Sequence, residues 1–291
     1  MISPFFLHKP STLEEASSIL AEHGEEAKIL AGGSDLVLLF KMGLARAKHV
    51  VDLKGLGGLD RVEFDSKRKV LRVGALVTHR MLETSSAVRE YYPIFAAMER
   101  QVANVRVRNV GTLGGNLCFA EPHADPGTLL LAYQAEVKAR SRSGERTLRI
   151  DDFFVDYYQT DLREDEILTE VEIPLLGDNF CGTYRRFCPG ERLTVGMALL
   201  IEWQDRICRD VRLALGCVGP RPIRAREVEE ALRGKPAEEI SAKALEAGER
   251  AASLVDPPPD VWGSTDYKRQ IVKVLVSRGL QDLCRRRTLH G

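Results

Sequence analysis

Two glycine pairs constrain the fold of this chain more than any other feature. They stand in the polar segments Ala31-Gly32-Gly33-Ser34-Asp35 and Gly111-Thr112-Leu113-Gly114-Gly115-Asn116. Paired glycines let a backbone take positive φ angles and let another group approach the main chain closely. Consecutive N–H groups in such a turn can form a nest for an anion such as a pyrophosphate. Each pair could equally be a plain turn.

The surroundings of the two pairs favour the ligand-binding alternative. The first pair directly follows a short strand predicted over residues 27–30, and the hydroxyls of Ser34 and Thr112 could donate to phosphate oxygens. A polar cluster, Glu121-Pro122-His123-Ala124-Asp125, lies just beyond the second pair. Neither segment matches the G-x-G-x-x-G or G-x-x-x-x-G-K-[ST] motif, so Rossmann and P-loop sites are not indicated. The pattern predicts a dinucleotide site of another kind.

Hydrophobic periodicity predicts an α+β protein of two domains. Residues 1–175 would form the first domain, with a small α/β subdomain over about 1–55 and a second subdomain over 56–175. Residues 176–291 would form a C-terminal domain with a three-stranded sheet and helices. Its strands are expected at 180–186, 194–203 and 211–218, and its helices at 223–232, 240–255 and 265–286.

Composition excludes several classes of partner. The 291 residues carry 42 basic and 42 acidic side chains, and this zero net charge argues against nucleic acid or an anionic membrane as the main partner. The sequence has no apolar run of about 18 residues and no secretory signal, so we expect no transmembrane segment and a cytoplasmic location. The 6 cysteines form no C-x-x-C pair and are expected to be free thiols. No spacing resembles a metal site.

Five motifs in order along the chain resemble the FAD-binding (medium) subunits of molybdenum hydroxylases, the family of carbon monoxide dehydrogenase medium subunits and xanthine dehydrogenase flavin domains. The family patterns are A-G-G-x-[SD]-L, R-N-x-G-T-[IL]-G-G-N-[IL], A-x-P-x-[SA]-D, a strand pair, and G-S-x-x-Y-[RK]. They correspond here to residues 31–36, 108–117, 120–125, 157–174 and 263–268. The resemblance implies a two-subdomain FAD-binding domain of the vanillyl-alcohol-oxidase/xanthine-dehydrogenase type, followed by a C-terminal domain of the CO dehydrogenase flavoprotein type.

The resemblance also implies which residues hold FAD. The first glycine segment would wrap the pyrophosphate through backbone amides, and the second would complete the phosphate cradle. Val102, Ile167 and Leu168 would make apolar contacts, Asp125 would accept a hydrogen bond from the sugar-like chain, and a cation at Arg185 or Arg186 would lie near the flavin ring. The full set is Leu30, Ala31, Gly32, Gly33, Ser34, Asp35, Leu36, Val102, Gly111, Thr112, Leu113, Gly114, Gly115, Asn116, Asp125, Ile167, Leu168, Arg185 and Arg186.

Ordinary structural roles remain alternatives for some of these residues. Asp125 could simply begin a turn before Pro126, and the two arginines could form a solvated strand face. The spacing near Arg185 slips by one residue against the family pattern, so Arg186 could serve instead.

The resemblance predicts an electron-transfer flavoprotein subunit with no catalytic residue of its own. Molybdopterin would sit on a large partner subunit and [2Fe-2S] clusters on a small one, in a dimer of heterotrimers, with NAD or a quinone as external acceptor. Only Cys118 lies in the segment where one branch of the family carries an iron–sulfur loop, so no cluster is expected in this chain. The alternatives are a stand-alone flavin oxidase of the vanillyl-alcohol-oxidase type and a non-catalytic scaffold subunit.

Overall fold

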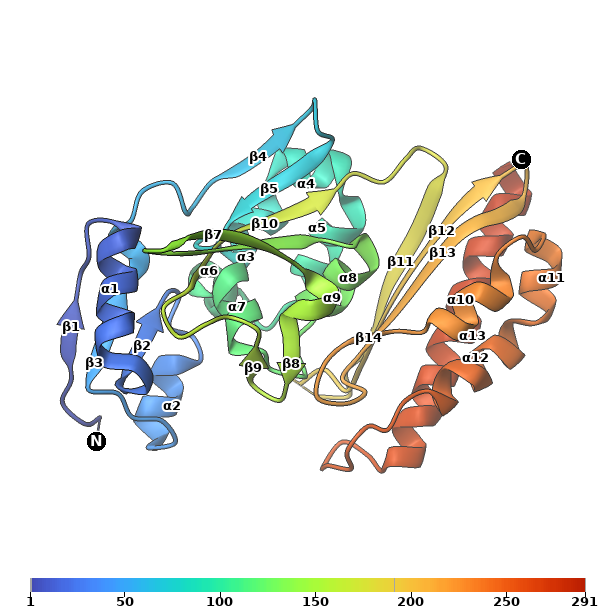
Figure 1. Cartoon of the computed structure of the whole chain (residues 1–291). Helices are drawn as coiled ribbons and strands as arrows, with labels where there is room; N and C mark the ends of the chain where they lie inside the picture. The colour runs from blue at the N-terminus through green and yellow to red at the C-terminus, as the bar shows by residue number, and fades with distance from the viewer. Residues whose placement is uncertain (1, 191, 291) are drawn as a thin grey trace. The chain divides into compact units, whose positions relative to one another are not determined.

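The computed structural model describes residues 2–190 and 192–290, and it divides into two compact units. The first unit comprises residues 1–120 and 135–174, and the second comprises 121–134 and 175–291 (Figure 1). The chain changes unit at 174/175, whereas the sequence-based border was placed at 175/176. The short segment 121–134, however, belongs to the second unit although both of its flanks belong to the first.

The first unit begins with a small parallel sheet in the order β1-β3-β2. Helix α1 packs on it through Ala16 and Leu20, which join a buried cluster with Val51 of β3. Thr12 caps α1 by accepting a hydrogen bond from the Glu15 amide at 3.1 Å. The elements of this part are β1 (Phe6–His8), α1 (Leu13–His23), η1 (Gly24–Glu26), β2 (Ala27–Leu30), α2 (Leu36–Met42), β3 (His49–Asp52) and η2 (Leu53–Gly55).

A second, antiparallel sheet in the order β4-β5-β10-β6-β7 forms the remainder of the first unit's framework. Its central strand β10 is buried along most of its length, in agreement with its apolar sequence. The strands are β4 (Val62–Asp65), β5 (Val70–Gly74), β6 (Glu136–Ser141), β7 (Gly144–Arg149) and β10 (Ile167–Pro174), and the short pair is β8 (Phe154–Asp156) and β9 (Gln159–Thr160).

Short helices between β5 and β6 carry the second glycine segment. They are α3 (His79–Thr84), α4 (Ser86–Tyr91), α5 (Pro93–Glu99), α6 (Val105–Val110) and α7 (Leu113–Phe119), and α9 (Ile150–Phe153) follows later. The expected glycine turn at 111–116 is therefore largely helical: after Gly111, a new helix begins with Thr112 as its N-cap.

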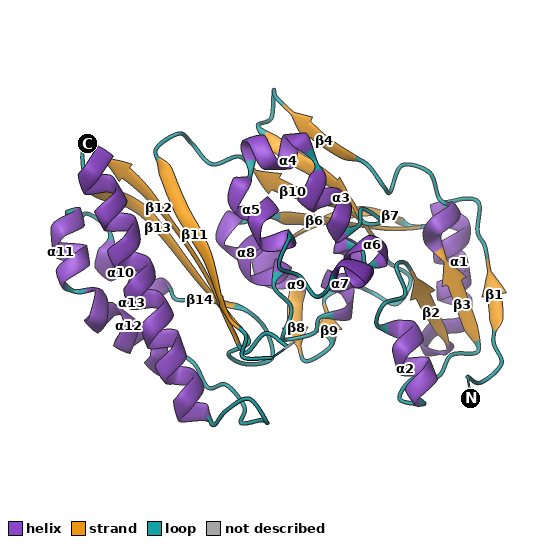
Figure 2. Cartoon of the chain, turned by 180° about the vertical axis from the view of Figure 1, so that it is seen from behind, coloured by secondary structure: helices purple, strands orange, loops and turns teal. Residues whose placement is uncertain are grey.

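The second unit is a sheet in the order β11-β12-β13-β14 with helices α10 to α13 along one face (Figure 2). Alternate residues of β12 and β13, such as Met197 and Leu213, are fully buried against those helices. The elements are α8 (Pro126–Tyr133), β11 (Phe180–Phe187), β12 (Val195–Gln204), β13 (Ile207–Gly216), β14 (Ile223–Arg224), α10 (Arg226–Leu232), α11 (Ala237–Ala242), α12 (Ala244–Ser253) and α13 (Thr265–His290).

Three details of this unit differ from the sequence-based expectation. The described residues add a fourth, two-residue strand, β14, where a helix start was expected. The helix expected over 240–255 is split into α11 and α12 at Lys243. Strand β13 begins at Ile207, because Asp205 and Arg206 both take positive φ, 48° and 68°, and close a tight hairpin. That turn lacks the usual Asn or Gly, so the sequence pattern does not reveal it.

Helix α8 is anchored in the second unit by a close backbone approach. A Cβ added to Gly216 of β13 would lie 1.9 Å from the Thr128 hydroxyl oxygen, so only glycine allows this contact. All eight residues of α8 are buried. This packing explains why residues 121–134 belong to the second unit.

Candidate functional site

The first glycine segment presents unused backbone donors. It leaves β2 at Leu30, and Gly33 has a φ of 76°, a conformation that favours glycine. Among the residues that the structure describes, no oxygen accepts a hydrogen bond from the backbone N–H groups of Gly32, Gly33 and Ser34. The Ser34 hydroxyl itself donates to the Asp35 carboxylate at 2.8 Å. The segment therefore has the consecutive free amides that the sequence led us to expect for anion binding.

The second glycine segment uses its amides within the protein. Leu113 N–H donates to the Val77 carbonyl at 2.9 Å, and Gly114 N–H donates to the Ala75 carbonyl at 3.0 Å. The next two amides, of Gly115 and Asn116, both donate to Thr112, to its hydroxyl at 3.0 Å and its carbonyl at 2.9 Å. In this structure the segment is not the second anion nest that the glycine pattern suggested.

Glycine serves a different purpose in this second segment. A Cβ on Gly114 would lie 2.6 Å from the Ala75 Cβ and 2.7 Å from the Ala75 oxygen. The helix α7 thus begins in direct contact with the chain that leaves β5. The absence of a side chain allows close packing rather than an unusual backbone angle.

The two segments, distant in sequence, touch each other. A Cβ on Gly32 would lie 2.1 Å from the Val110 oxygen and 2.9 Å from the Gly111 Cα. A Cβ on Gly111 would likewise lie 3.5 Å from the Ser34 hydroxyl, and one on Gly115 would lie 3.7 Å from the Ala31 Cβ. The fold therefore joins the two glycine segments into one surface within the first unit.

The residues of this surface fit a bound group that offers both acceptors and donors. The free amides of the first segment would donate to phosphate oxygens. From α7, the side-chain oxygen of Asn116 is buried and has no hydrogen-bond partner among the described residues. Because buried polar atoms are nearly always hydrogen-bonded, this oxygen is suited to accept a hydrogen bond from a ligand. The expected FAD would satisfy both requirements.

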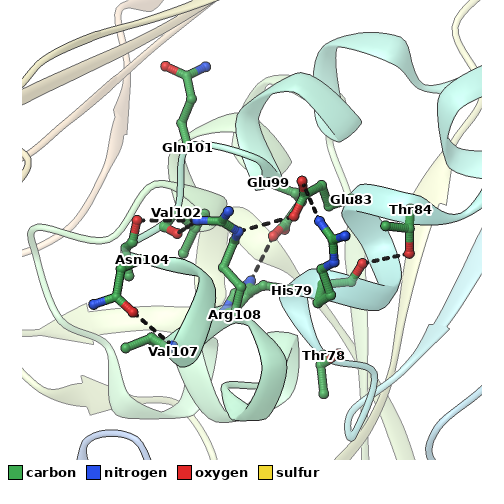
Figure 3. A network of polar contacts seen from close by, with 12 residues as sticks. Thr78, His79, Glu83, Thr84, Glu99, Gln101, Val102, Asn104, Val107 and Arg108 are labelled. Carbon is green, nitrogen blue, oxygen red and sulfur yellow. Dashed lines mark hydrogen bonds and ion pairs between the residues drawn. The ribbon is translucent and has the colours of Figure 1, made fainter.

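A buried polar network lies behind the second segment (Figure 3). The His79 backbone N–H donates to the Gly111 carbonyl at 3.0 Å, and its ring Cδ2 lies 3.4 Å from the Cβ position of Gly111. The His79 Nδ1 is 2.7 Å from an oxygen of Glu99, and the two side chains are 3% and 0% exposed. His79 thus connects the turn between α6 and α7 to helix α5.

Arg108 and Glu83 extend this network to the loop before α6. The Arg108 guanidinium donates to the Val102 carbonyl at 2.9 Å and to the Glu83 carboxylate at 3.1 Å. Burial raises the pKa of Glu83, but hydrogen bonds from Arg80 and Arg108 outweigh it and hold the pKa below its usual value. The carboxylate is therefore charged at neutral pH and holds Arg108 in place.

Sequence reasoning assigned no role to His79, Glu83 or Glu99. Their partners are 20 and 25 residues away along the chain, so no local pattern marks them. Arg108 stands in the motif R-N-x-G-T, which is the sequence feature that could have pointed to this network. The structure explains that arginine as a support for the loop and not as a ligand of phosphate.

The apolar residues of the expected site are buried. Val102, Ile167 and Leu168 are 7%, 1% and 3% exposed. Ile167 belongs to the cluster that α1 and β3 form, so it has a core role independent of any cofactor. Leu30 and Leu36 flank the first glycine segment and remain half-buried.

The remaining expected residues belong to the second unit, where Asp125 and Arg186 meet. Asp125 is 4% exposed and accepts a hydrogen bond from the Tyr184 hydroxyl at 2.8 Å. The same carboxylate oxygen lies 3.3 Å from the Arg186 Nε. Burial raises the pKa of Tyr184 well above its usual value, and the Asp125 charge raises it further, so this phenol stays a hydrogen-bond donor.

Arg185 lies on the opposite face of the same strand. In β11 successive side chains alternate, and Arg185 forms an ion pair with Asp282 of α13. Arg186, not Arg185, therefore shares a face with Asp125.

The neighbouring motif residues His123 and Lys268 have partners of their own. The His123 ring nitrogens lie 2.8 Å from Glu121 and 3.7 Å from Asp260. Lys268 is 1% exposed and donates to Asp260 and to the Pro258 carbonyl, both at 2.7 Å. Lys268, the last residue of the motif G-S-x-x-Y-[RK], thus fixes the segment between α12 and α13.

Comparison with known families gives two matches that together cover most of the chain. The family described as FAD binding domain in molybdopterin dehydrogenase matches residues 3–176. The family described as CO dehydrogenase flavoprotein C-terminal domain matches residues 190–283. Within the described residues, no helix is long and apolar enough to cross a membrane.

Individual relatives match over nearly their whole length. The nicotine 6-hydroxylase medium subunit of Paenarthrobacter nicotinovorans is 34% identical, covering 92% of this chain and 93% of the relative. The carbon monoxide dehydrogenase medium chain of Hydrogenophaga pseudoflava is 29% identical, covering 96% and 97%. Among solved structures, quinoline 2-oxidoreductase from Pseudomonas putida 86 superimposes with a TM-score of 0.90 at 30% identity, covering 98% of each chain. Carbon monoxide dehydrogenase from H. pseudoflava gives 0.91 at 28%, covering 96% and 97%.

Proposed function

Because the chain belongs to the family of FAD-binding domains of molybdopterin dehydrogenases, we propose that it carries electrons through FAD between two partner subunits and an external acceptor. The family resemblance expected from the five motifs is confirmed by these matches. The chain is thus an FAD-binding medium subunit of the molybdenum hydroxylase type. The direction of electron flow, the acceptor and the partners are the parts that we propose.

One observation carries the cofactor site: the contact between the two glycine segments. It brings the free amides of residues 32–34 next to Val110 and Gly111, the turn that leads into helix α7, and so supports a cofactor site built from both segments. When bound, FAD supplies a ring that exchanges one or two electrons and so can mediate between one-electron clusters and two-electron acceptors. The residues of the chain hold and orient the cofactor, and the network of His79 and Arg108 keeps the second segment rigid.

The partners are proposed from the expectation that the motifs raised. A large subunit would hold molybdopterin, a small subunit would hold [2Fe-2S] clusters, and the three chains would assemble as a dimer of heterotrimers. Electrons would pass from the clusters to FAD and on to NAD or a quinone in the cytoplasm. The names of the relatives support this, because those relatives are called medium subunits or medium chains of hydroxylases and dehydrogenases.

The proposal is tested by a flavin titration followed by co-purification. We expect the purified chain to take up one equivalent of FAD, with an absorption band that dithionite bleaches and no iron–sulfur shoulder. Tagged chain expressed in its own host should then co-purify with a molybdenum protein and an iron–sulfur protein. A chain that takes up no FAD, either alone or within such a complex, would overturn the proposed function.

A pair of variants tests the cation that we place near the ring. We assign the cation near the ring to Arg186, because it lies on the same strand face as Asp125, another expected cofactor-binding residue. Arg185 instead forms an ion pair with Asp282. A positive charge near the ring favours its reduced form, so Arg186→Gln should lower the reduction potential of bound flavin. Arg185→Gln is the matched control on the same strand. The reverse result would return the role to Arg185.

A further inference from the structure

Three histidines that are far apart in the sequence come together beside the first sheet. His8 ends β1, His23 ends α1 and His49 begins β3. Among the described residues, they form the only group of three or more potential metal-ligating side chains whose ligand atoms all lie close together, within 4.8 Å of one another. All three side chains are half-buried.

The three rings are in direct contact. The Nε2 of His8 lies 2.9 Å from the Nδ1 of His49. The rings of His23 and His49 stack with centroids 3.5 Å apart and an angle of 12° between their planes. Phe6 stacks against His49 as well, with centroids 5.5 Å apart. The cluster is therefore held by packing on several sides and is not a set of freely moving surface side chains.

Imidazole binds metal ions in its neutral form. Glu26 is already paired with Lys48, and the Glu22 carboxylate lies 4.0 Å from the His23 Nε2. Glu22 thus places a negative charge beside the cluster, whereas the charge of Glu26 is balanced by Lys48.

We propose that His8, His23 and His49 form a binding site for a divalent transition metal ion of the Zn²⁺ type, with the remaining coordination position open to water. Imidazole nitrogen is a preferred ligand of Zn²⁺, Cu²⁺ and Ni²⁺. Tetrahedral Zn²⁺ with bonds of about 2.0 Å holds its ligand nitrogens about 3.3 Å apart. The ligand nitrogens already lie within 4.8 Å of one another, and the stacked rings of His23 and His49 must turn apart for both lone pairs to meet at one ion.

The site is separate from the proposed FAD surface. In the register of β2 and β3, His49 pairs with Ala27 at the start of β2, whereas the glycine segment begins after Leu30 at its end. An ion bound there would connect β1, α1 and β3, and would stabilise this sheet by binding only the folded state. It would not touch the flavin.

The test is a Zn²⁺ titration of the full chain, with and without FAD, followed by calorimetry and thermal unfolding. We expect one equivalent to bind and the unfolding temperature to rise. We expect His23→Gln and His49→Gln each to weaken binding at least about tenfold, because each removes one of three ligands. His123→Gln, which removes an imidazole elsewhere, should bind Zn²⁺ as the original chain does. Co²⁺ should give visible d–d absorption that His23→Gln abolishes.

The outcomes separate the alternatives. Should His49→Gln fail to fold, His23→Gln decides, since His23 lies at a helix end. Binding that both histidine variants leave unchanged would place Zn²⁺ elsewhere, for instance on the free thiols, and would overturn the proposal. No binding at millimolar Zn²⁺ would do the same. FAD uptake should be equal in all variants, so this result is independent of the proposed function.

Discussion

The two glycine segments look alike in sequence but differ in what their glycines do. In the first, Gly33 adopts a positive φ and the amides of residues 32–34 remain available. In the second, the amides of residues 113–116 are all used within the protein, and Gly114 is needed because Ala75 is so close. A glycine pair can therefore serve a ligand site in two ways. It can expose backbone N–H donors directly, or it can let a supporting helix pack closely against a neighbouring strand end.

The largest effect is expected where the two segments meet. Gly32→Ala would place a methyl group 2.1 Å from the Val110 oxygen, and a backbone atom cannot move aside cheaply. We expect unfolding free energy to fall by about 3 kcal/mol and FAD affinity to fall about 100-fold. Urea unfolding and flavin titration measure the two. Gly57→Ala is the control, because nothing lies within 4 Å of its added Cβ. Equal behaviour of the two variants would mean that the segments do not touch.

The second expected effect separates support from direct binding. Gly114→Ala would bring a methyl group 2.6 Å from the Ala75 Cβ, so unfolding free energy should fall by about 2 kcal/mol. The variant should still bind one equivalent of FAD when saturated, because the Gly114 amide already donates to the Ala75 carbonyl. Loss of all FAD binding at unchanged stability would show instead that Gly114 contacts the cofactor.

The third prediction concerns the unpartnered oxygen in the second segment. Asn116→Leu keeps the side-chain volume and removes the buried acceptor. FAD affinity should fall about tenfold, since the lost hydrogen bond is worth about 1.4 kcal/mol. Stability of the FAD-free chain should stay equal or rise, because the oxygen has no partner among the described residues. A drop in stability without a change in affinity would make Asn116 a structural residue.

The smallest expected effect is a pH dependence behind the second segment. The pKa of Glu83 is lower in the folded chain than its ordinary value of 4.5, so its charge stabilises the fold fully above about pH 4.5. This contribution is lost as the pH falls through the lower, folded-state pKa. Glu83→Gln should therefore show a shallower loss of stability under acid than the original chain in urea unfolding. Glu63→Gln, a change at an exposed residue, should keep the original dependence of unfolding free energy on pH. The same pH dependence in the original chain and both variants would show that Glu83 does not stabilise the fold through its charge.

Much of the first segment could be predicted from sequence, because its signals are local. A strand and a glycine pair stand in direct succession, and β2 and the turn at Gly33 appear where they were expected. In the second segment the decisive contacts are with Ala75 and Val77, more than thirty residues earlier. Local patterns cannot reveal such contacts, so the helix α7 was taken for a turn.

The same reasoning applies to the residues that sequence analysis left without a role. His79 and Glu99 come together only when α3 and α5 pack, and the three histidines at 8, 23 and 49 meet only when β1 pairs with β3. The sequence likewise could not show that Arg186 faces Asp125 while Arg185 pairs with Asp282, and which of the two lies near the flavin ring stays a prediction. Motifs identified the family, whereas three-dimensional packing was needed to assign these side chains.

The course of the chain between the two units has a consequence for synthesis on the ribosome. Helix α8 is buried along its whole length, and Gly216, on which Thr128 packs, follows it by more than eighty residues. Until that strand leaves the ribosome, the apolar helix has no sheet to cover it, although the chain on both its sides can already fold. The nascent protein therefore exposes this apolar helix for several seconds at typical elongation rates. Chaperone occupancy during translation should peak in this interval and decline once β13 has emerged.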